Sequence, residues 1–250
     1  MTAPIPRDIP DLPAIPGRPS TLLPTPVPAG AVVPPVRRPL TAAFRLLTAL
    51  LALTGVTIEL LLSGPPLRTL SHFTIQSGIL LALVLLASAR RAWTARRPLP
   101  GTLTGAALLY VAVAGLVHHL LLAGAASPFA TPAGTGTAWQ TAATHILHTA
   151  VPIAATLDWL LLTAPGHLHL RQAAAWLLYP LAYLAFSLGR GELLLPGTQD
   201  RYLYPFLDVD DHGYKGVLGN ALLLGLAVYA LAVLLVAVDH IRPNPLRRRW

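Results

Sequence analysis

The 250-residue chain contains no cysteine, a single methionine and few charged side chains. The absence of cysteine excludes disulfides, thiolate metal sites, iron–sulfur clusters and a cysteine nucleophile. Charged residues make up 11% of the chain and hydrophobic residues 54%, whereas about a quarter of the residues of a soluble globular domain are charged. The composition therefore predicts an integral membrane protein.

Lysine is nearly absent as well, since Lys215 is the only one. The net charge of +8 thus comes from arginine, and most of the arginines lie in short runs beside apolar segments. Such runs orient a protein in the bilayer. We therefore expect no nucleic acid among its partners.

Residues 1–40 are rich in proline and contain no apolar run that could pack. This predicts a disordered, partly polyproline segment that serves as a spacer or binds a partner domain. The segment has no continuous apolar core like that of a secretory signal peptide, so we expect the first span to be an uncleaved anchor. Residues 41–241 then form the membrane domain, and residues 242–250 form a basic cytoplasmic tail.

Apolar runs of about 20 residues, the length that a helix needs to cross a bilayer, follow one another through the membrane domain. They are continuous rather than alternating and are rich in Leu and Ala, which favours helices over strands. Six such segments are predicted, at approximately 41–62, 72–92, 102–125, 139–163, 171–190 and 216–239. The predicted fold class is all-α, a polytopic bundle of six transmembrane helices.

The distribution of basic residues predicts the orientation of the bundle. Thirteen arginines lie before the first span, after the last, and in the connections after spans two and four, against three arginines and Lys215 in the other connections. Cytoplasmic flanks are enriched in Lys and Arg. We therefore predict a multi-pass protein of the plasma membrane with both termini in the cytoplasm.

The segment 141–161 carries three ionisable residues, His145, His148 and Asp158, in a run long enough to cross the membrane. Such groups are costly in hydrocarbon and indicate either a functional site or hydrogen bonds between helices. Pro152 frees the carbonyl four residues earlier, that of His148, which then needs a neighbour or a water molecule. The predicted topology places both histidines near the outer face.

Asp158 lies about ten residues, or roughly 15 Å of helix, deeper than His148. It is too deep to join the outer polar cluster. We expect it to be a structural partner of Tyr179 or Tyr183 on the next helix.

Other polar residues reach the same outer level from different spans. They are Glu59, His72, Thr74, Gln76, Ser77, His118, His119 and Arg190. The loop 191–215, with its acidic and aromatic residues, either caps the outer mouth of the bundle or places its tyrosines at the membrane interface.

A haem between spans three and four is one interpretation of the histidines, with His118 or His119 facing His145 or His148. A metal site is disfavoured, because Glu59 is the only carboxylate near this level and no HExxH spacing occurs. We expect neither a metal nor a cofactor. Interhelical hydrogen bonding in a non-catalytic lipid-binding or scaffold protein is a further alternative.

Four short motifs resemble the androgen-induced family of integral membrane proteins and their bacterial relatives. They are HFTIQSG at 72–78, THILHT at 144–149, YPLAYLAFSLGRGE at 179–192 and YPFLD at 204–208. Eukaryotic members of that family are intramembrane threonine hydrolases that cleave fatty-acid esters of hydroxy fatty acids. The resemblance thus implies a lipid or fatty-acyl ester substrate.

The same resemblance implies that Thr74 is the nucleophile and that His148 is its partner. An imidazole within reach of the hydroxyl can take its proton as the ester is attacked. The groups that we expect to bind the substrate or the developing oxyanion are Gln76, Ser77, His118 and His145, with Arg190 holding a carboxylate head group at the outer interface.

Overall fold

Leucine- and alanine-rich runs form helices over nearly all of the chain that the structure describes. The structure is a computed structural model, and it describes residues 36–123, 137–198 and 201–244. These residues form helices and connections, without a strand among them. Most of the Pro-rich segment 1–40, and the tail beyond residue 244, lie outside the described residues. The all-α prediction is confirmed for the described part.

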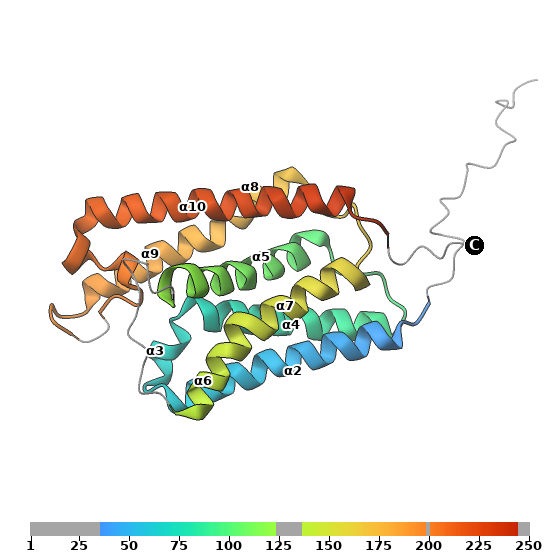
Figure 1. Cartoon of the computed structure of the whole chain (residues 1–250), viewed down its shortest axis with the longest axis horizontal. Helices are drawn as coiled ribbons and strands as arrows, with labels where there is room; N and C mark the ends of the chain where they lie inside the picture. Colours follow the sequence, from blue (N-terminus) through green and yellow to red (C-terminus); the bar gives the residue numbers. More distant parts are fainter. Residues whose placement is uncertain (1–35, 124–136, 199–200, 245–250) are drawn as a thin grey trace, which may run out of the picture. The chain divides into compact units, whose positions relative to one another are not determined.

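Nine α-helices, three π-helical turns and one 3₁₀ turn are found in the described residues (Figure 1). The α-helices are α2 (Pro39–Leu62), α3 (Pro66–Leu70), α4 (Phe73–Trp93), α5 (Gly101–Val117), α6 (Ala138–His145), α7 (Val151–Leu157), α8 (Leu170–Trp176), α9 (Leu178–Leu193) and α10 (Val209–Ile241). The π-helical turns are η1 (His118–Leu122), η2 (Ile146–Ala150) and η3 (Asp158–Leu162), and the 3₁₀ turn is η4 (Pro205–Leu207).

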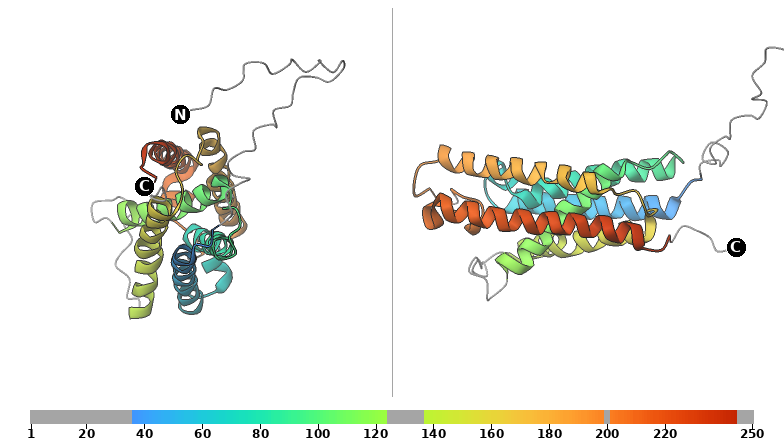
Figure 2. Two further views of the ribbon diagram at one scale, coloured as in Figure 1. Left: turned by 90° about the vertical axis from the view of Figure 1, so that its right-hand side faces the viewer. Right: turned by 90° about the horizontal axis from the view of Figure 1, so that it is seen from above.

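Five helical stretches of the described residues are long and apolar enough to cross a membrane. They are Pro39–Leu62, Phe73–Trp93, Gly101–Leu122, Ala138–Leu162 and Val209–Ile241. They run side by side in Figure 1 and in the right-hand view of Figure 2. Large leucines stand exposed on their outward faces, such as Leu222 at 65% and Leu223 at 68% on α10. Exposed apolar surface of this extent suits contact with lipid.

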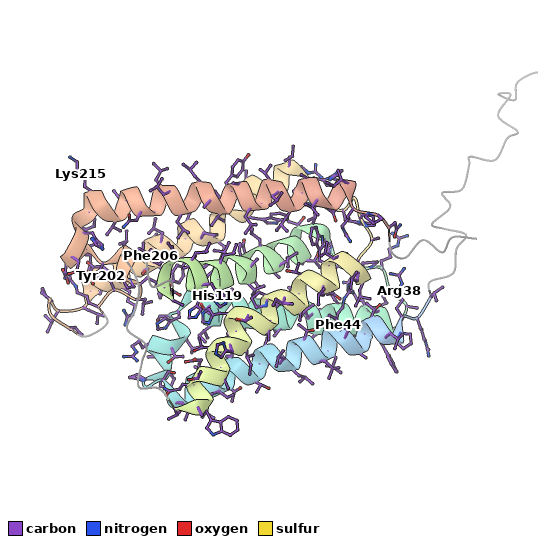
Figure 3. All side chains as sticks on the ribbon, viewed as in Figure 1. Arg38, Phe44, His119, Tyr202, Phe206 and Lys215 are labelled. Carbon is purple, nitrogen blue, oxygen red and sulfur yellow. The ribbon has the colours of Figure 1, made fainter. Side chains whose placement is uncertain are left out.

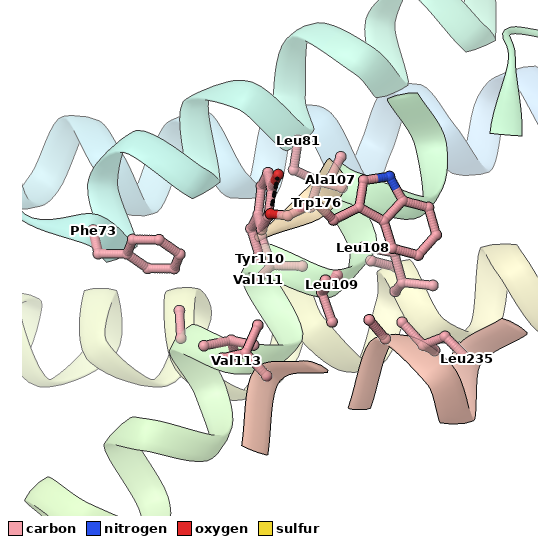
Figure 4. Packing of buried hydrophobic residues seen from close by; sticks show 14 of the residues in the cluster. Phe73, Leu81, Ala107, Leu108, Leu109, Tyr110, Val111, Val113, Trp176 and Leu235 are labelled. Carbon is pink, nitrogen blue, oxygen red and sulfur yellow. Dashed lines mark hydrogen bonds between the residues drawn. The ribbon is translucent and has the colours of Figure 1, made fainter. Parts of the chain in front are cut away.

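The predicted span 171–190 is two helices, α8 and α9, which meet at Leu177. Pro180 explains the break, because it has no N–H to donate to the carbonyl of Trp176 four residues earlier. That carbonyl instead accepts a hydrogen bond from the Tyr110 hydroxyl of α5 at 2.9 Å (Figure 4). The interruption is therefore stabilised by a neighbouring helix, as is usual for proline in a membrane helix.

Helix α5 lies at the centre of the packing and contacts α4, α7 and α10. Leu108, Leu109, Tyr110 and Val111 are all buried although they are consecutive, so this helix is covered on every side. Figure 4 shows them among Phe73, Trp176 and Leu235 of three other helices. A helix that is apolar all round is stable in such a position.

At the arginine-rich end of the bundle, Asp239 and Arg242 join three segments in a buried cluster. The Asp239 carboxylate accepts the N–H groups of His167 and Leu168 at 2.8 and 2.9 Å, the Trp159 indole N–H, and the Arg242 guanidinium. Arg242 also donates to the carbonyl of Trp159 at 2.6 Å. Residue 242, the first residue of the predicted tail, is thus buried in the bundle.

Asp158 has a different partner from the expected tyrosines. Its carboxylate accepts a hydrogen bond from Arg45 of α2 at 2.8 Å. Tyr179 and Tyr183 donate instead to Gln76 and to the Ser71 carbonyl, near the start of α4. The expectation was wrong, because Arg45 of α2 reaches Asp158, whereas both tyrosines bond near the start of α4.

Candidate active site

Thr74 lies in the first turn of α4, directly after the connection that ends at His72. Its hydroxyl oxygen Oγ1 is 3.2 Å from Nε2 of His148, which belongs to the π-helical turn η2 of another helical stretch. Both side chains are partly buried. The structure therefore brings together the two residues that the resemblance selects, from positions 74 residues apart.

The tautomer of His148 follows from its second hydrogen bond. Its Nδ1 lies 3.0 Å from the carbonyl oxygen of Thr144, one turn earlier. A carbonyl can only accept, so Nδ1 must carry the proton, and in the neutral ring Nε2 then has the free lone pair. The Thr74 hydroxyl thus donates to Nε2. This is the orientation in which an imidazole serves as a base toward a hydroxyl.

Pro152 and Gly115 shape the backbone behind His148. Pro152 has no N–H to donate to the His148 carbonyl. The π-helical turn η2 lies just before Pro152 in the chain. The freed carbonyl lies against Gly115 of α5, where an added Cβ would come within 2.8 Å of its oxygen. Glycine is thus required at this close approach. π-Helical turns of this kind often occur at functional sites.

Two further histidines extend the cluster from η1. The His118 ring stacks on that of His148 with centroids 4.1 Å apart and planes at 24°. His119 Nε2 contacts the Thr149 hydroxyl at 3.0 Å. Face-to-face stacking does not place the nitrogens of His118 and His148 on opposite sides of a haem iron. Within the described residues, no group of three or more His, Asp or Glu residues is placed to hold a metal ion.

Tyr204, in the loop before α10, is a site residue that sequence reasoning missed. It lies against the start of α4, where the Thr74 side chain and the backbone of Phe73 and Thr74 oppose part of the rise in its pKa that burial causes. Burial raises the pKa of Tyr204, so the phenol stays protonated and can donate. The signal was present, because Tyr204 begins the YPFLD motif.

The loop that carries Tyr204 packs into the bundle. Tyr204, Phe206 and Leu207 belong to the buried core, which agrees with a cap rather than an interfacial belt. Phe206 and His119 lie toward the same end of the molecule, whereas Arg38 lies at the opposite end (Figure 3). The candidate site is therefore far from the arginine-rich end.

Two cavities meet at Thr74 and His148. One of about 100 Å³ is lined mostly by apolar side chains of α5, α9 and α10. The other, of about 320 Å³, has a mixed lining, with polar side chains such as Glu59, Arg68 and His72 beside apolar ones such as Leu147 and Leu203. The residues that line both cavities are Thr74, Leu122, His148 and Tyr204. We call them the apolar chamber and the polar chamber.

The other residues predicted to bind the substrate have different surroundings. His118 lines the polar chamber. Gln76 and Ser77 line neither chamber, since Gln76 bonds to Tyr179 and to the Leu70 carbonyl, and Ser77 donates to the Thr74 carbonyl. Exposed His145 also lies outside both chambers, and so does Arg190, which donates to the Arg201 carbonyl.

The chain was compared with protein-family models, with characterised proteins and with solved structures, and no match was found in any of the three comparisons.

Proposed function

We propose that the protein is an intramembrane hydrolase of lipid esters, with Thr74 as nucleophile and His148 as general base. The observation that carries the proposal is the contact of 3.2 Å between the Thr74 hydroxyl and His148 Nε2. The Thr144 carbonyl supports it by holding the ring in the tautomer that accepts the proton. The resemblance to the androgen-induced family selects the same two residues.

In the first step, Thr74 Oγ1 attacks the ester carbonyl and passes its proton to His148 Nε2. The tetrahedral intermediate collapses to acyl-Thr74, and the imidazolium returns the proton to the departing alcohol oxygen. In the second step, water attacks acyl-Thr74 with His148 again as base. The products are a free fatty acid and regenerated Thr74.

Negative charge on the carbonyl oxygen needs donors aimed at it during both steps. The neutral hydroxyl of Tyr204 supplies one such donor beside Thr74. The N–H groups of the first turn of α4 supply others, because they lack partners within their own helix. When an ester carbonyl binds at Thr74, the Tyr204 hydroxyl would give up its present contacts and donate to the carbonyl oxygen of the ester.

The topology that suits this function has both termini in the cytoplasm of a plasma-membrane protein, with α8 and α9 as a sixth, broken crossing. The apolar chamber is bounded by α9 and α10, so an acyl chain can reach it from the hydrocarbon layer. The polar chamber supplies water for the second step. A lipid ester would then react without leaving the bilayer.

Ester turnover by purified protein in detergent tests the proposal, with 4-nitrophenyl octanoate as an activated substrate. We expect hydrolysis by the wild type, loss of at least about a thousandfold in Thr74→Val, and partial retention in Thr74→Ser. Thr54→Val is the matched control, since exposed Thr54 donates only within its own helix, to the Leu50 carbonyl. Its turnover should equal that of the wild type.

The opposite outcome is also informative. If Thr74→Val lowers the thermal stability and leaves turnover intact, the contact with His148 is an interhelical hydrogen bond and the nucleophile assignment is wrong.

A further inference from the structure

We infer that the alcohol half of the substrate is a small, uncharged polyol such as glycerol, bound in the polar chamber, while the acyl half occupies the apolar chamber. The protein would then be an acylglycerol hydrolase. This inference rests on the proposed function, because it assigns the two chambers around Thr74 to the two sides of the scissile ester bond.

The lining of the apolar chamber matches a hydrocarbon chain, although at about 100 Å³ it holds only the part of the chain nearest the ester. Its walls include Val113 of α5, Leu184 of α9, and Leu224 and Val228 of α10. The hydroxyl of Tyr183, which also lines it, donates elsewhere, to the Ser71 carbonyl. A polar alcohol group placed here would lose its hydrogen bonds to water without replacement.

The polar chamber presents donors and acceptors close together. Glu59 accepts a hydrogen bond from the Ser63 hydroxyl, and Arg68 donates to the Ser63 carbonyl at 2.9 Å. The chamber wall also contains Thr69 and Thr144, whose hydroxyls can both donate and accept. An apolar alcohol group here would displace water from these groups without replacing its hydrogen bonds, whereas a polyol would replace them.

The charges of this chamber favour an uncharged alcohol group over a carboxylate. Glu59 and Arg68 have opposite sign and share the same wall, so they offer no excess of positive charge. An additional carboxylate would be repelled by Glu59. A polyol, in contrast, can donate to Glu59 and accept from Arg68.

The direction of the reaction agrees with this assignment. The imidazole of His148 faces both chambers, so its Nε2 proton can reach an alcohol oxygen on the polar side. Bond cleavage then leaves acyl-Thr74 with its chain in the apolar chamber. The protonated polyol departs through the polar chamber, and water takes its place for the second step.

The test is a panel of three oleoyl esters given to the purified full-length protein in mixed micelles. They are 1-monooleoylglycerol, the oleoyl ester of a hydroxy fatty acid, and oleyl oleate. We expect kcat/KM for monooleoylglycerol to exceed that for each of the others by at least about tenfold. Equal values, or a preference for either of the other esters, would overturn the inference.

Two variants assign the chambers separately. Glu59→Gln removes the negative charge at nearly constant shape and should raise the relative rate on the hydroxy-fatty-acid ester by about tenfold. Gly225→Leu is the matched change in the apolar chamber, where an added Cβ meets no atom within 4 Å. It should shift the preference to shorter acyl chains and leave the alcohol preference unchanged.

The outcomes separate this inference from the proposed function. One outcome contradicts only the substrate assignment. In that outcome the protein hydrolyses 4-nitrophenyl octanoate with dependence on Thr74, but it shows no preference for monooleoylglycerol or turns over none of the panel esters. Absence of Thr74-dependent turnover contradicts the proposed function, and the substrate assignment fails with it. If Gly225→Leu instead alters the alcohol preference, the alcohol half occupies the apolar chamber and the inference is overturned.

Discussion

The two ends of the bundle both bury polar side chains, yet they use them differently. At the arginine-rich end, Asp239 and Arg242 saturate one another and the surrounding backbone with hydrogen bonds. At the other end, Thr74 and His148 are uncharged partners that face two cavities. A saturated ion pair has no donor or acceptor left for a ligand, whereas the threonine hydroxyl remains accessible.

The difference teaches how polar residues of a membrane helix can be sorted into structural and reactive ones. Burial alone does not separate them, since polar side chains at both ends are at least partly buried. What separates them is whether every hydrogen-bonding position is occupied and whether open space adjoins the group. By this criterion Asp239 holds the fold together, and Thr74 meets the condition that the proposed reaction requires.

The largest expected effect concerns the saturated end. Asp239→Asn removes the carboxylate and leaves Arg242 buried without its counter-charge, which costs about 3–5 kcal/mol of stability. Thermal unfolding in detergent should therefore shift to much lower temperature. Asp211→Asn, on the exposed first turn of α10, is the matched control and should cost less than about 1 kcal/mol. Equal shifts would erase the contrast between the two ends.

A smaller effect on stability but a clear one on activity is expected for Gly115→Ala. The added methyl would press on the His148 carbonyl and on Pro152, moving the imidazole away from Thr74. We expect turnover to fall by about 10- to 100-fold, with a stability loss of about 1–3 kcal/mol.

The control for this change is Gly189→Ala on α9, where a Cβ meets open space. It should leave turnover unchanged. Normal turnover in Gly115→Ala would mean that the backbone behind His148 does not set the geometry of the site.

The smallest effect is a dependence of stability on pH at the edge of the polar chamber. Burial lowers the pKa of His72 below 6.5, and the hydrogen bonds that its ring donates to the Arg68 and Thr69 carbonyls oppose this shift. The unfolded state therefore binds the extra proton first, so stability is complete above about pH 6.5 and declines as the pH falls below it. His72→Phe should flatten this decline between about pH 7.5 and pH 5.5, measured by thermal unfolding.

The helices could be predicted because their signal is local. A continuous apolar run of about 20 residues specifies a helix without knowledge of its neighbours. The predicted bounds lie within about three residues of the observed ones, except that α10 begins at Val209 rather than at residue 216. The exception is the segment that breaks at Leu177. Pro180 can be read from the sequence. The break also depends on Tyr110 of another helix, however, because its hydroxyl donates a hydrogen bond to the Trp176 carbonyl.

Part of the candidate site could also be predicted from a local signal. His148 stood out as a costly polar residue, and its pairing with Thr74 came from the resemblance together with their similar depth. Tyr204 was missed, because its contact with Thr74 requires the path of the loop before α10. Arg45 was missed as the partner of Asp158, since no local pattern tells which helix lies beside it.

The most direct measurement of the central claim is the location of a covalent adduct. The purified wild type is treated with an alkyl fluorophosphonate, digested with trypsin and analysed by fragmentation of the peptide 69–90, which lies between Arg68 and the cleavage site at Arg90. We predict one alkylphosphonyl group, attached to Thr74. An adduct on another residue of the chain, or a folded wild type that takes up none, would contradict it.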